Sequence, residues 1–148
     1  MNVYISCDRK AIREFHTIRM ICEKIGVGIV FDWTMYDIAA DEKLKEKVRK
    51  SIEGIEDCDV FVILYNGEVT GDMMFEYGCA VALRKEIVFV NLTNDLKSDL
   101  IKSAYMRLIR DENYLVSISD LEGFLKGIKK CFGNGCDDCG DEEMAGWG

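Results

Sequence analysis

A glutamate at the start of an expected helix is the residue of this sequence best placed to do chemistry. Glu76 follows an apolar run and the loop Gly67–Asp72, and a helix-like segment and a second apolar run come after it. Such a β-loop-α-β unit puts its loop where open α/β sheets bind ligands. We expect Glu76 in the first turn of the helix, where the helix dipole favours the ionised form. An ionised carboxylate at the mouth of a sheet is a candidate nucleophile.

A second carboxylate precedes the first by one helical turn. Asp72 lies four residues before Glu76, and two carboxylates so placed raise one pKa of the pair. Asp72 therefore has two interpretations, an acid partner of Glu76 or the N-cap of the helix. The N-cap is the more common role for an aspartate at such a position.

The elements that must position these residues alternate along the chain. Apolar runs predict strands at Asn2–Cys7, Val27–Trp33, Asp59–Tyr65, Glu86–Leu92 and Tyr114–Ile118. Helical apolar spacing predicts helices at Asp8–Ile25, Asp41–Asp57, Met73–Lys85, Asp95–Tyr105 and Ser119–Phe132. Asp8 and Gly26 are the expected caps of the first helix, and Ser119 is the expected N-cap of the last.

This order predicts an α/β fold of the Rossmann or flavodoxin-like kind. We expect a single-domain three-layer sandwich with a parallel sheet of four or five strands and helices on both faces. The domain would span residues 1–132, and the Gly-, Asp- and Glu-rich segment 133–148 would form a loosely ordered tail.

The composition of the chain argues against some classes of binding partner. The net charge is −8 and the pI is about 4.7, so the chain lacks the basic footprint that binds nucleic acid or an anionic membrane. No apolar run approaches the roughly 20 residues of a membrane span, and no charged region precedes the first strand, so we expect no signal peptide. These features predict a cytoplasmic protein with a small-molecule partner.

The chain has seven cysteines, and four of them are expected to be reduced and mostly buried: Cys7, Cys22, Cys58 and Cys79. The other three, Cys131, Cys136 and Cys139, lie near acidic residues and allow either zinc binding or disulfide formation in air. A structural zinc site usually has four ligands in two short pairs, and only one such pair is present. We therefore expect no metal and no cofactor.

Three segments resemble the nucleoside 2-deoxyribosyltransferase superfamily, which includes the 2′-deoxynucleoside 5′-phosphate N-hydrolases. They are Val3–Cys7, Cys58–Val62 and Glu76–Ala80, the last of which matches Glu-x-Gly-x-Ala in full. The resemblance covers residues 2–92. It implies that Glu76 attacks the anomeric carbon of the sugar and that Tyr4 lies near the tyrosine that orients this glutamate. The loop Gly67–Asp72 falls where the family holds the sugar or its 5′-phosphate. A carboxylate can trap the oxocarbenium-like state of such a reaction.

Two departures from the family pattern stand out. Ser51 occupies the position, about eight residues before Asp59, where the family has an aspartate. A serine can hydrogen-bond there but cannot be a general acid near neutral pH, and it has a second interpretation as a small helix-packing residue. The loop also differs, because Thr70–Glu76 lacks the glycine pattern that usually precedes the glutamate.

We predict a pocket at the carboxyl edge of the sheet. Its catalytic residues would be Glu76, Asp72 and Tyr4, although Tyr4 could instead be a packed strand residue. Its substrate-binding residues would be Ser6, Cys7, Asp8, Asp32, Trp33, Ser51, Asn66, Gly67 and Gly71. Trp33 would either stack on a base or pack at the rim.

Three functions fit these residues. The first is cleavage or base exchange at the N-glycosidic bond of a nucleoside or nucleotide, through a glutamate nucleophile. The second is a TIR-like NAD glycohydrolase, and the third is a non-catalytic nucleotide-binding module of the same fold. The resemblance also implies a homodimer or higher homo-oligomer, with Tyr36 and exposed Met73 and Met74 at the interface.

Overall fold

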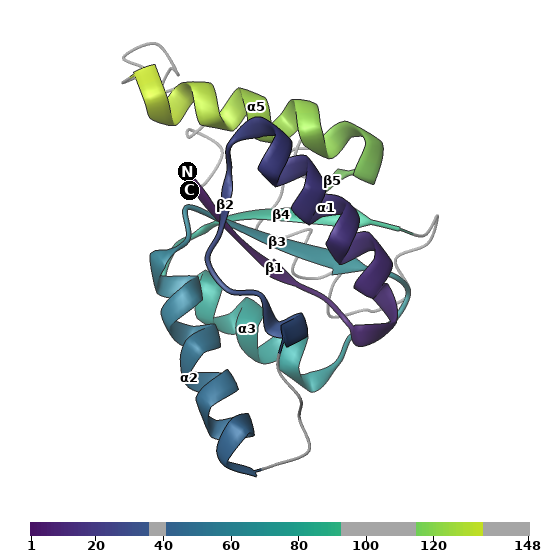
Figure 1. The fold of residues 1–148 in the computed structure, drawn as a ribbon, viewed down its shortest axis with the longest axis vertical. Coiled ribbons are helices and arrows are strands. Elements are labelled where there is room, and N and C mark those ends of the chain that lie inside the picture. The colour runs from purple at the N-terminus through teal and green to yellow at the C-terminus, as the bar shows by residue number, and fades with distance from the viewer. Residues whose placement is uncertain (36–40, 93–114, 135–148) are drawn as a thin grey trace.

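A parallel five-stranded sheet lies between two layers of helices (Figure 1). The computed structural model describes residues 1–35, 41–92 and 115–134. The strands are β1 (Asn2–Ser6), β2 (Gly28–Ile29), β3 (Val60–Tyr65), β4 (Glu86–Asn91) and β5 (Leu115–Val116). They lie in the order β2-β1-β3-β4-β5, and every neighbouring pair is parallel. The predicted parallel sheet is confirmed.

Helices cover both faces of the sheet, as predicted. The helical segments are η1 (Arg9–Ala11), α1 (Ile12–Ile25), η2 (Trp33–Met35), α2 (Asp41–Asp57), α3 (Gly71–Ala82) and α5 (Ile118–Asn134). Helices α1 and α5 cover one face, and α2 and α3 cover the other (Figure 1). The helix predicted at Asp95–Tyr105 lies outside the described residues, and so do most of the predicted tail and Tyr36.

The centre of the sheet is β3, which is buried along its whole length because every one of its six residues is apolar or aromatic. Its Phe61 stacks on Tyr4 of β1, with ring centroids 5.6 Å apart. A close approach of α2 covers the same ring, since a Cβ added at Gly54 would lie 3.2 Å from Tyr4 Cδ2 and from the Cβ of Phe31. This packing fixes the face of β1 that carries Tyr4.

The second strand is shorter than predicted. Only Gly28–Ile29 pairs with β1, and the chain turns into η2 at Trp33. The Asp32 carboxylate causes this turn, because its Oδ1 accepts a hydrogen bond from the backbone N–H of Thr34 at 3.0 Å. A side chain that satisfies the backbone in this way ends the extended conformation.

Helix starts also differ from those predicted. Asp8 caps η1 rather than α1, since it accepts a hydrogen bond from Lys10 N. Helix α3 begins two residues earlier than expected because Thr70 is its N-cap, with Met73 N donating to Thr70 Oγ1 at 3.2 Å. Helix α5 begins at Ile118, and Ser117 is the serine that bonds its first turn. The N-cap interpretation of Asp72 and the cap predicted at Ser119 are therefore wrong.

Candidate active site

The chain reverses the direction in which it adds strands to the sheet between β1 and β3. The chain moves outward from β1 to β2 and then crosses back to β3 on the other side of β1. In open α/β sheets, ligands bind beyond the carboxyl ends of two strands so arranged. The residues just after β1 and β3, and the helix α3 that follows β3, therefore frame the candidate site.

Tyr4 and Ser6 come from β1, and Glu76 comes from α3. Tyr4 and Ser6 alternate with Val3 and Ile5 along the strand, so their side chains lie on one face. Both are about 1 % exposed. Their hydroxyls lie close enough to the Glu76 carboxylate to lower its pKa. Residues 70 and 72 positions apart in the sequence are thus brought together.

Glu76 is not the ionised first-turn residue that the sequence predicted. It is the sixth residue of α3 and lies in the second turn, beyond the strongest influence of the helix dipole. Burial instead raises the pKa of its carboxyl from 4.5 to about 7. Tyr4, Ser6 and Lys47 act against this rise, and Asp72 adds to it. A carboxyl group with a pKa near 7 can hold or release a proton at neutral pH.

Three polar atoms at this point are buried without a hydrogen bond of ordinary geometry. They are Tyr4 Oη, Ser6 Oγ and Glu76 Oε2. Burial, and then the neighbouring Glu76, raise the pKa of the Tyr4 hydroxyl far above 10, so it remains a proton donor. Buried polar groups are nearly always paired in folded proteins. Polar groups of a bound molecule could pair with these atoms.

Ser51 of α2 joins this cluster through Tyr4. It is 5 % exposed, and its hydroxyl lies near enough to the Tyr4 hydroxyl to oppose the rise in the pKa of Tyr4. Ser51 therefore acts on a residue that in turn acts on Glu76. Both predicted interpretations of Ser51, as a packing residue and as a member of the site, fit its position.

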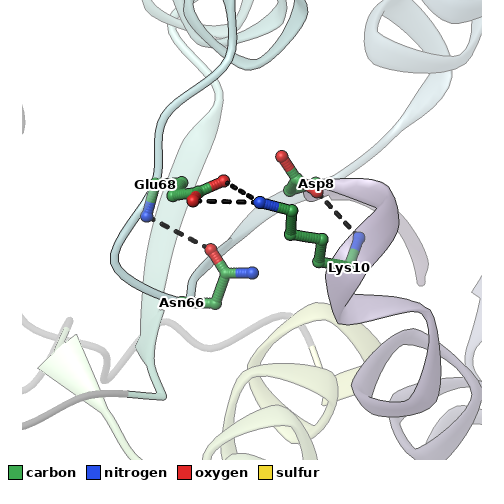
Figure 2. A network of polar contacts seen from close by, with 4 residues as sticks. All are labelled: Asp8, Lys10, Asn66 and Glu68. Atoms are coloured by element: carbon green, nitrogen blue, oxygen red, sulfur yellow. Dashed lines mark hydrogen bonds and ion pairs between the residues drawn. The ribbon is translucent and has the colours of Figure 1, made fainter.

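The loops after β1 and β3 are tied together at the rim of the site (Figure 2). Lys10 Nζ lies 2.9 Å from one oxygen of Glu68 and 3.0 Å from the other. Asp8 Oδ1 accepts from Lys10 N at 2.7 Å, and Asn66 Oδ1 accepts from Glu68 N at 3.2 Å. Gly67, with φ of 102°, makes the turn between them possible. The predicted residues Asp8, Asn66 and Gly67 thus shape two loops that flank the site.

Gly71 and Asp72 are exposed in the first turn of α3. A Cβ added at Gly71 would meet nothing within 4 Å, so open space adjoins the start of the helix. Asp72 acts on Glu76 as a like charge.

Asp32 and Trp33 have partners within the protein. Asp32 Oδ2 lies 3.1 Å from Arg19 Nη1, and its other oxygen accepts from both the backbone N–H and the hydroxyl of Thr34. Trp33 is 7 % exposed, and the ammonium of Lys47 lies 5.8 Å from the centroid of its ring. Their roles in binding a substrate stay predictions.

The Cys7 thiol is half-buried just after β1. Burial and the charge of Glu76 raise its pKa to about 12. A thiol in that state is neutral at physiological pH and is a weak nucleophile.

Sequence reasoning missed Lys10 and Lys47, and it named the loop that contains Glu68 without naming Glu68 itself. All three are charged residues whose spacing carries no motif. The one available signal was that Lys47 precedes Ser51 by four residues, which puts the two on one helix face.

Two surface hollows lie away from Glu76. The first, of about 390 Å³, is lined by Val30, Phe31, Asp32, Lys50, Glu53, Gly54 and Asp57. The second, of about 490 Å³, follows α5 and is lined by Gly123, Lys126, Gly127, Lys129, Lys130 and Gly133. Neither is the pocket predicted at the carboxyl edge of the sheet, which therefore stays a prediction.

Within residues 1–35, 41–92 and 115–134, no group of three or more His, Cys, Asp or Glu side chains is arranged to hold a metal ion. Cys131 is an exposed residue of α5, and Cys136 and Cys139 lie outside this part of the chain. No helix in the same residues is long and apolar enough to cross a membrane.

The fold of this chain is similar to that of two solved enzyme structures. A CMP N-glycosidase from Clostridium botulinum aligns over 86 % of this chain and 99 % of its own, with a TM-score of 0.59 and 14 % identity. A 2-deoxyribosyltransferase from Bacillus psychrosaccharolyticus aligns over 82 % of this chain and 90 % of its own, with a TM-score of 0.64 and 12 % identity. This chain shares their fold. No protein-family model matches the sequence, and no curated protein is similar to it.

Proposed function

We propose that this protein cleaves, or exchanges the base at, the N-glycosidic bond of a nucleoside or nucleotide, with Glu76 as the nucleophile. The observation that carries the proposal is that a buried carboxyl, whose pKa is raised to about 7, lies near the buried hydroxyls of Tyr4 and Ser6, which make no hydrogen bond of ordinary geometry. Perturbed carboxyls with unpaired polar neighbours are typical of catalytic sites. The fold shared with an N-glycosidase and a deoxyribosyltransferase supports the same chemistry.

The reaction would proceed by double displacement. The ionised Glu76 oxygen attacks C1′ of the sugar while the C1′–N bond breaks and its electron pair leaves with the base. The resulting glycosyl ester is then attacked at C1′ by water, which gives hydrolysis, or by a second base, which gives exchange. Tyr4 would orient Glu76 by donating its hydroxyl proton in a hydrogen bond, and Ser51 would in turn orient Tyr4.

We propose Asp72 as the residue that delivers a proton to the leaving base, for which the bound substrate would have to hold its carboxyl in the protonated form. Ser51, which stands where the resembled family has an aspartate, cannot supply that proton. Asp72 is the acidic side chain of α3 nearest to the proposed nucleophile in sequence, one helical turn before it. Its charge also raises the pKa of Glu76.

The loop after β3 would hold the sugar and its 5′ end. The start of α3 offers backbone N–H groups to an anion, and Lys10 supplies a positive charge at the same rim. Because Glu68 already places a carboxylate on Lys10, a 5′-phosphate could replace that carboxylate. Substitution of Lys10 by Met should then raise KM for a nucleoside 5′-monophosphate and leave KM for the nucleoside unchanged.

The deciding experiment is incubation with a panel of nucleosides, nucleotides and NAD, followed by chromatography of free base. Glu76→Gln should lower turnover by at least about a thousandfold, which corresponds to about 4 kcal/mol in the barrier. Glu53→Gln is the matched control, since Glu53 is an exposed glutamate of α2 that pairs with Arg49. Near-normal turnover by Glu76→Gln on any substrate of the wild type would rule Glu76 out as the nucleophile.

A nucleotide-binding module is the second candidate, and Ser51 is the observation that favours it. Release of no base from any compound, together with calorimetric binding of a nucleotide, would support this module. Release of nicotinamide from NAD alone would instead support a TIR-like glycohydrolase.

We also propose that the protein is a homo-oligomer. Of Met73 and Met74, both predicted to be exposed at the interface, Met73 is only 1 % exposed and belongs to the core, and Met74 is half-buried against it. Phe75 of α3 and Leu44 and Val48 of α2 are exposed apolar side chains of the layer formed by these two helices, by 50 %, 41 % and 42 %. Light scattering at micromolar concentration should give a mass above that of a monomer, and Phe75→Ser should lower it.

A further inference from the structure

An ion pair joins the two segments that flank the candidate site (Figure 2). Lys10 lies in η1, which follows β1, and Glu68 lies in the loop that follows β3. The Lys10 ammonium is 2.9 Å from one carboxylate oxygen of Glu68 and 3.0 Å from the other, so it contacts both oxygens. Because β1 and β3 are neighbouring parallel strands, the pair lies across the crevice at their carboxyl ends, where open α/β sheets bind ligands.

The backbone on each side of this pair is held by a local hydrogen bond. Asp8 Oδ1 accepts from Lys10 N at 2.7 Å and so caps η1. Asn66 Oδ1 accepts from Glu68 N at 3.2 Å, and Gly67 between them has a φ of 102°, a conformation that glycine adopts readily. Both side chains therefore extend from fixed backbone positions, and pairing them costs less conformational entropy than pairing two side chains of free loops.

Both members of the pair remain open to solvent. The Lys10 side chain is 68 % exposed and the Glu68 side chain is 57 % exposed. An ion pair so exposed is weak, because water screens the attraction and ordering two long side chains costs entropy. An anion of a bound molecule can therefore take the place of the Glu68 carboxylate, but it has to break the existing pair first.

The anion that competes most directly with this carboxylate is a phosphate. A 5′-phosphate carries a charge of about −1.5 to −2 at neutral pH, and like a carboxylate it presents several anionic oxygens to an ammonium. Asp8 and, in the first turn of α3, Asp72 add further carboxylates to the same region, and they repel a second anion. A sugar with a free 5′-hydroxyl is uncharged there and leaves the ion pair intact.

We propose that Glu68 is a specificity-determining residue, which occupies the Lys10 ammonium in place of a substrate phosphate and so favours a nucleoside over its 5′-phosphate. The inference rests on the proposed function, because it concerns the substrate of that site. A chain without this carboxylate would leave the ammonium free to pair with the phosphate. The preference is a property of binding, so it can be measured without catalysis.

The test is an NMR titration of the full-length protein with ribose and with ribose 5-phosphate, followed at the amide signal of Gly71, which begins α3. Glu68→Gln keeps the size of the side chain and removes its charge. It should raise the preference for ribose 5-phosphate over ribose by about fivefold, the upper range for one exposed ion pair. The double variant Lys10→Met/Glu68→Gln should lose this gain. Glu53→Gln, which frees Arg49 from an exposed ion pair on α2, is the matched control and should keep the wild-type preference.

An unchanged preference in Glu68→Gln would overturn the proposal. An equal gain in the double variant or in Glu53→Gln would also overturn it, since either would mean a general effect of charge. Binding of neither probe, by the wild type or by Glu68→Gln, would overturn it as well.

Activity separates this proposal from the proposed function. If the wild type releases a base, Glu68→Gln should raise the ratio of kcat/KM for the 5′-monophosphate to kcat/KM for the nucleoside by the same factor. If no base is released from any compound, the proposed function fails, and the titration with ribose and ribose 5-phosphate still decides the role of Glu68.

Discussion

We expect the ionised side chain of Glu76 to destabilise the folded protein. The variant Glu76→Gln should therefore have a larger free energy of unfolding than the wild type at neutral and alkaline pH. The unfolded chain releases the Glu76 proton near the ordinary pKa of 4.5, and the folded chain releases it near 7. One unit of pKa is worth about 1.4 kcal/mol. The difference of about 2.5 therefore means that ionising Glu76 in the folded state costs about 3 kcal/mol once the pH is well above 7.

The direction in which stability changes with pH follows from the number of protons that each state binds. Between pH 4.5 and 7 the folded state holds the proton that the unfolded state has lost, so the free energy of unfolding falls as the pH rises through this window. Below it both states are protonated and the cost vanishes. The glutamine variant has no such proton. Its advantage should be near zero at pH 4, grow through the window and level off above it.

Urea unfolding of both proteins at several pH values from 4 to 9 measures this difference. The amide of glutamine is close in size to the protonated carboxyl, so the two chains should coincide at the acidic end. Parallel curves across the whole range would refute the reasoning, because they would mean that Glu76 ionises in the folded protein as readily as in the unfolded one. Greater stability of the wild type at pH 8 would refute it more directly.

Four further variants test the positions around Glu76. Gly54→Ala should cost about 1–3 kcal/mol, because its Cβ would lie 3.2 Å from the tyrosine ring beneath it, whereas Gly78→Ala, whose Cβ meets nothing within 4 Å, should stabilise by about 0.5–1 kcal/mol; thermal unfolding compares the two. Thr70→Ala should lose about 1 kcal/mol with the N-cap of α3, and a denaturant midpoint equal to that of the wild type would contradict that cap. Asp72→Asn should lower the pH midpoint at which the Glu76 carboxyl titrates in a ¹³C NMR experiment, because it removes a like charge. It should also slow release of natural bases while sparing a nitrophenyl glycoside, whose leaving group needs no proton; equal slowing of both substrates would count against Asp72 as the acid.

Much of the architecture was readable from local patterns. The apolar run of β3, the loop after it and the helix around Glu76 form a contiguous segment, so neighbouring residues define one another. The alternation of Tyr4 and Ser6 along β1 likewise fixed which residues share a face. Sequence could therefore predict that these residues meet at one edge of the sheet.

The features that the sequence did not predict depend on contacts between segments that are distant in the chain. Asp72 and Thr70 are both acceptable N-caps, and the choice of Thr70 moved Glu76 from the first turn to the second. Burial, which the helix pattern does not reveal, reversed the expected direction of its pKa. The end of β2 was misplaced because the capping of a turn by Asp32 outweighed the strand pattern around it. Lys47 carried no motif, since its contact with the Trp33 ring joins two segments that are separate in the sequence.

The order of the strands in the sheet determines when, during synthesis, the sheet can form. Val3 pairs with Val60, and four residues of β1 pair with β3, whereas only two pair with β2. While the ribosome is still adding residues before Val60, the first strand therefore has only its short partner, and the aromatic ring of Tyr4 lacks Phe61 beneath it. Parallel pairing also requires the whole crossover through α2 before it can begin. We expect nascent chains arrested before β3 to be sensitive to protease and to expose apolar surface, and chains extended through β4 to become resistant together rather than strand by strand.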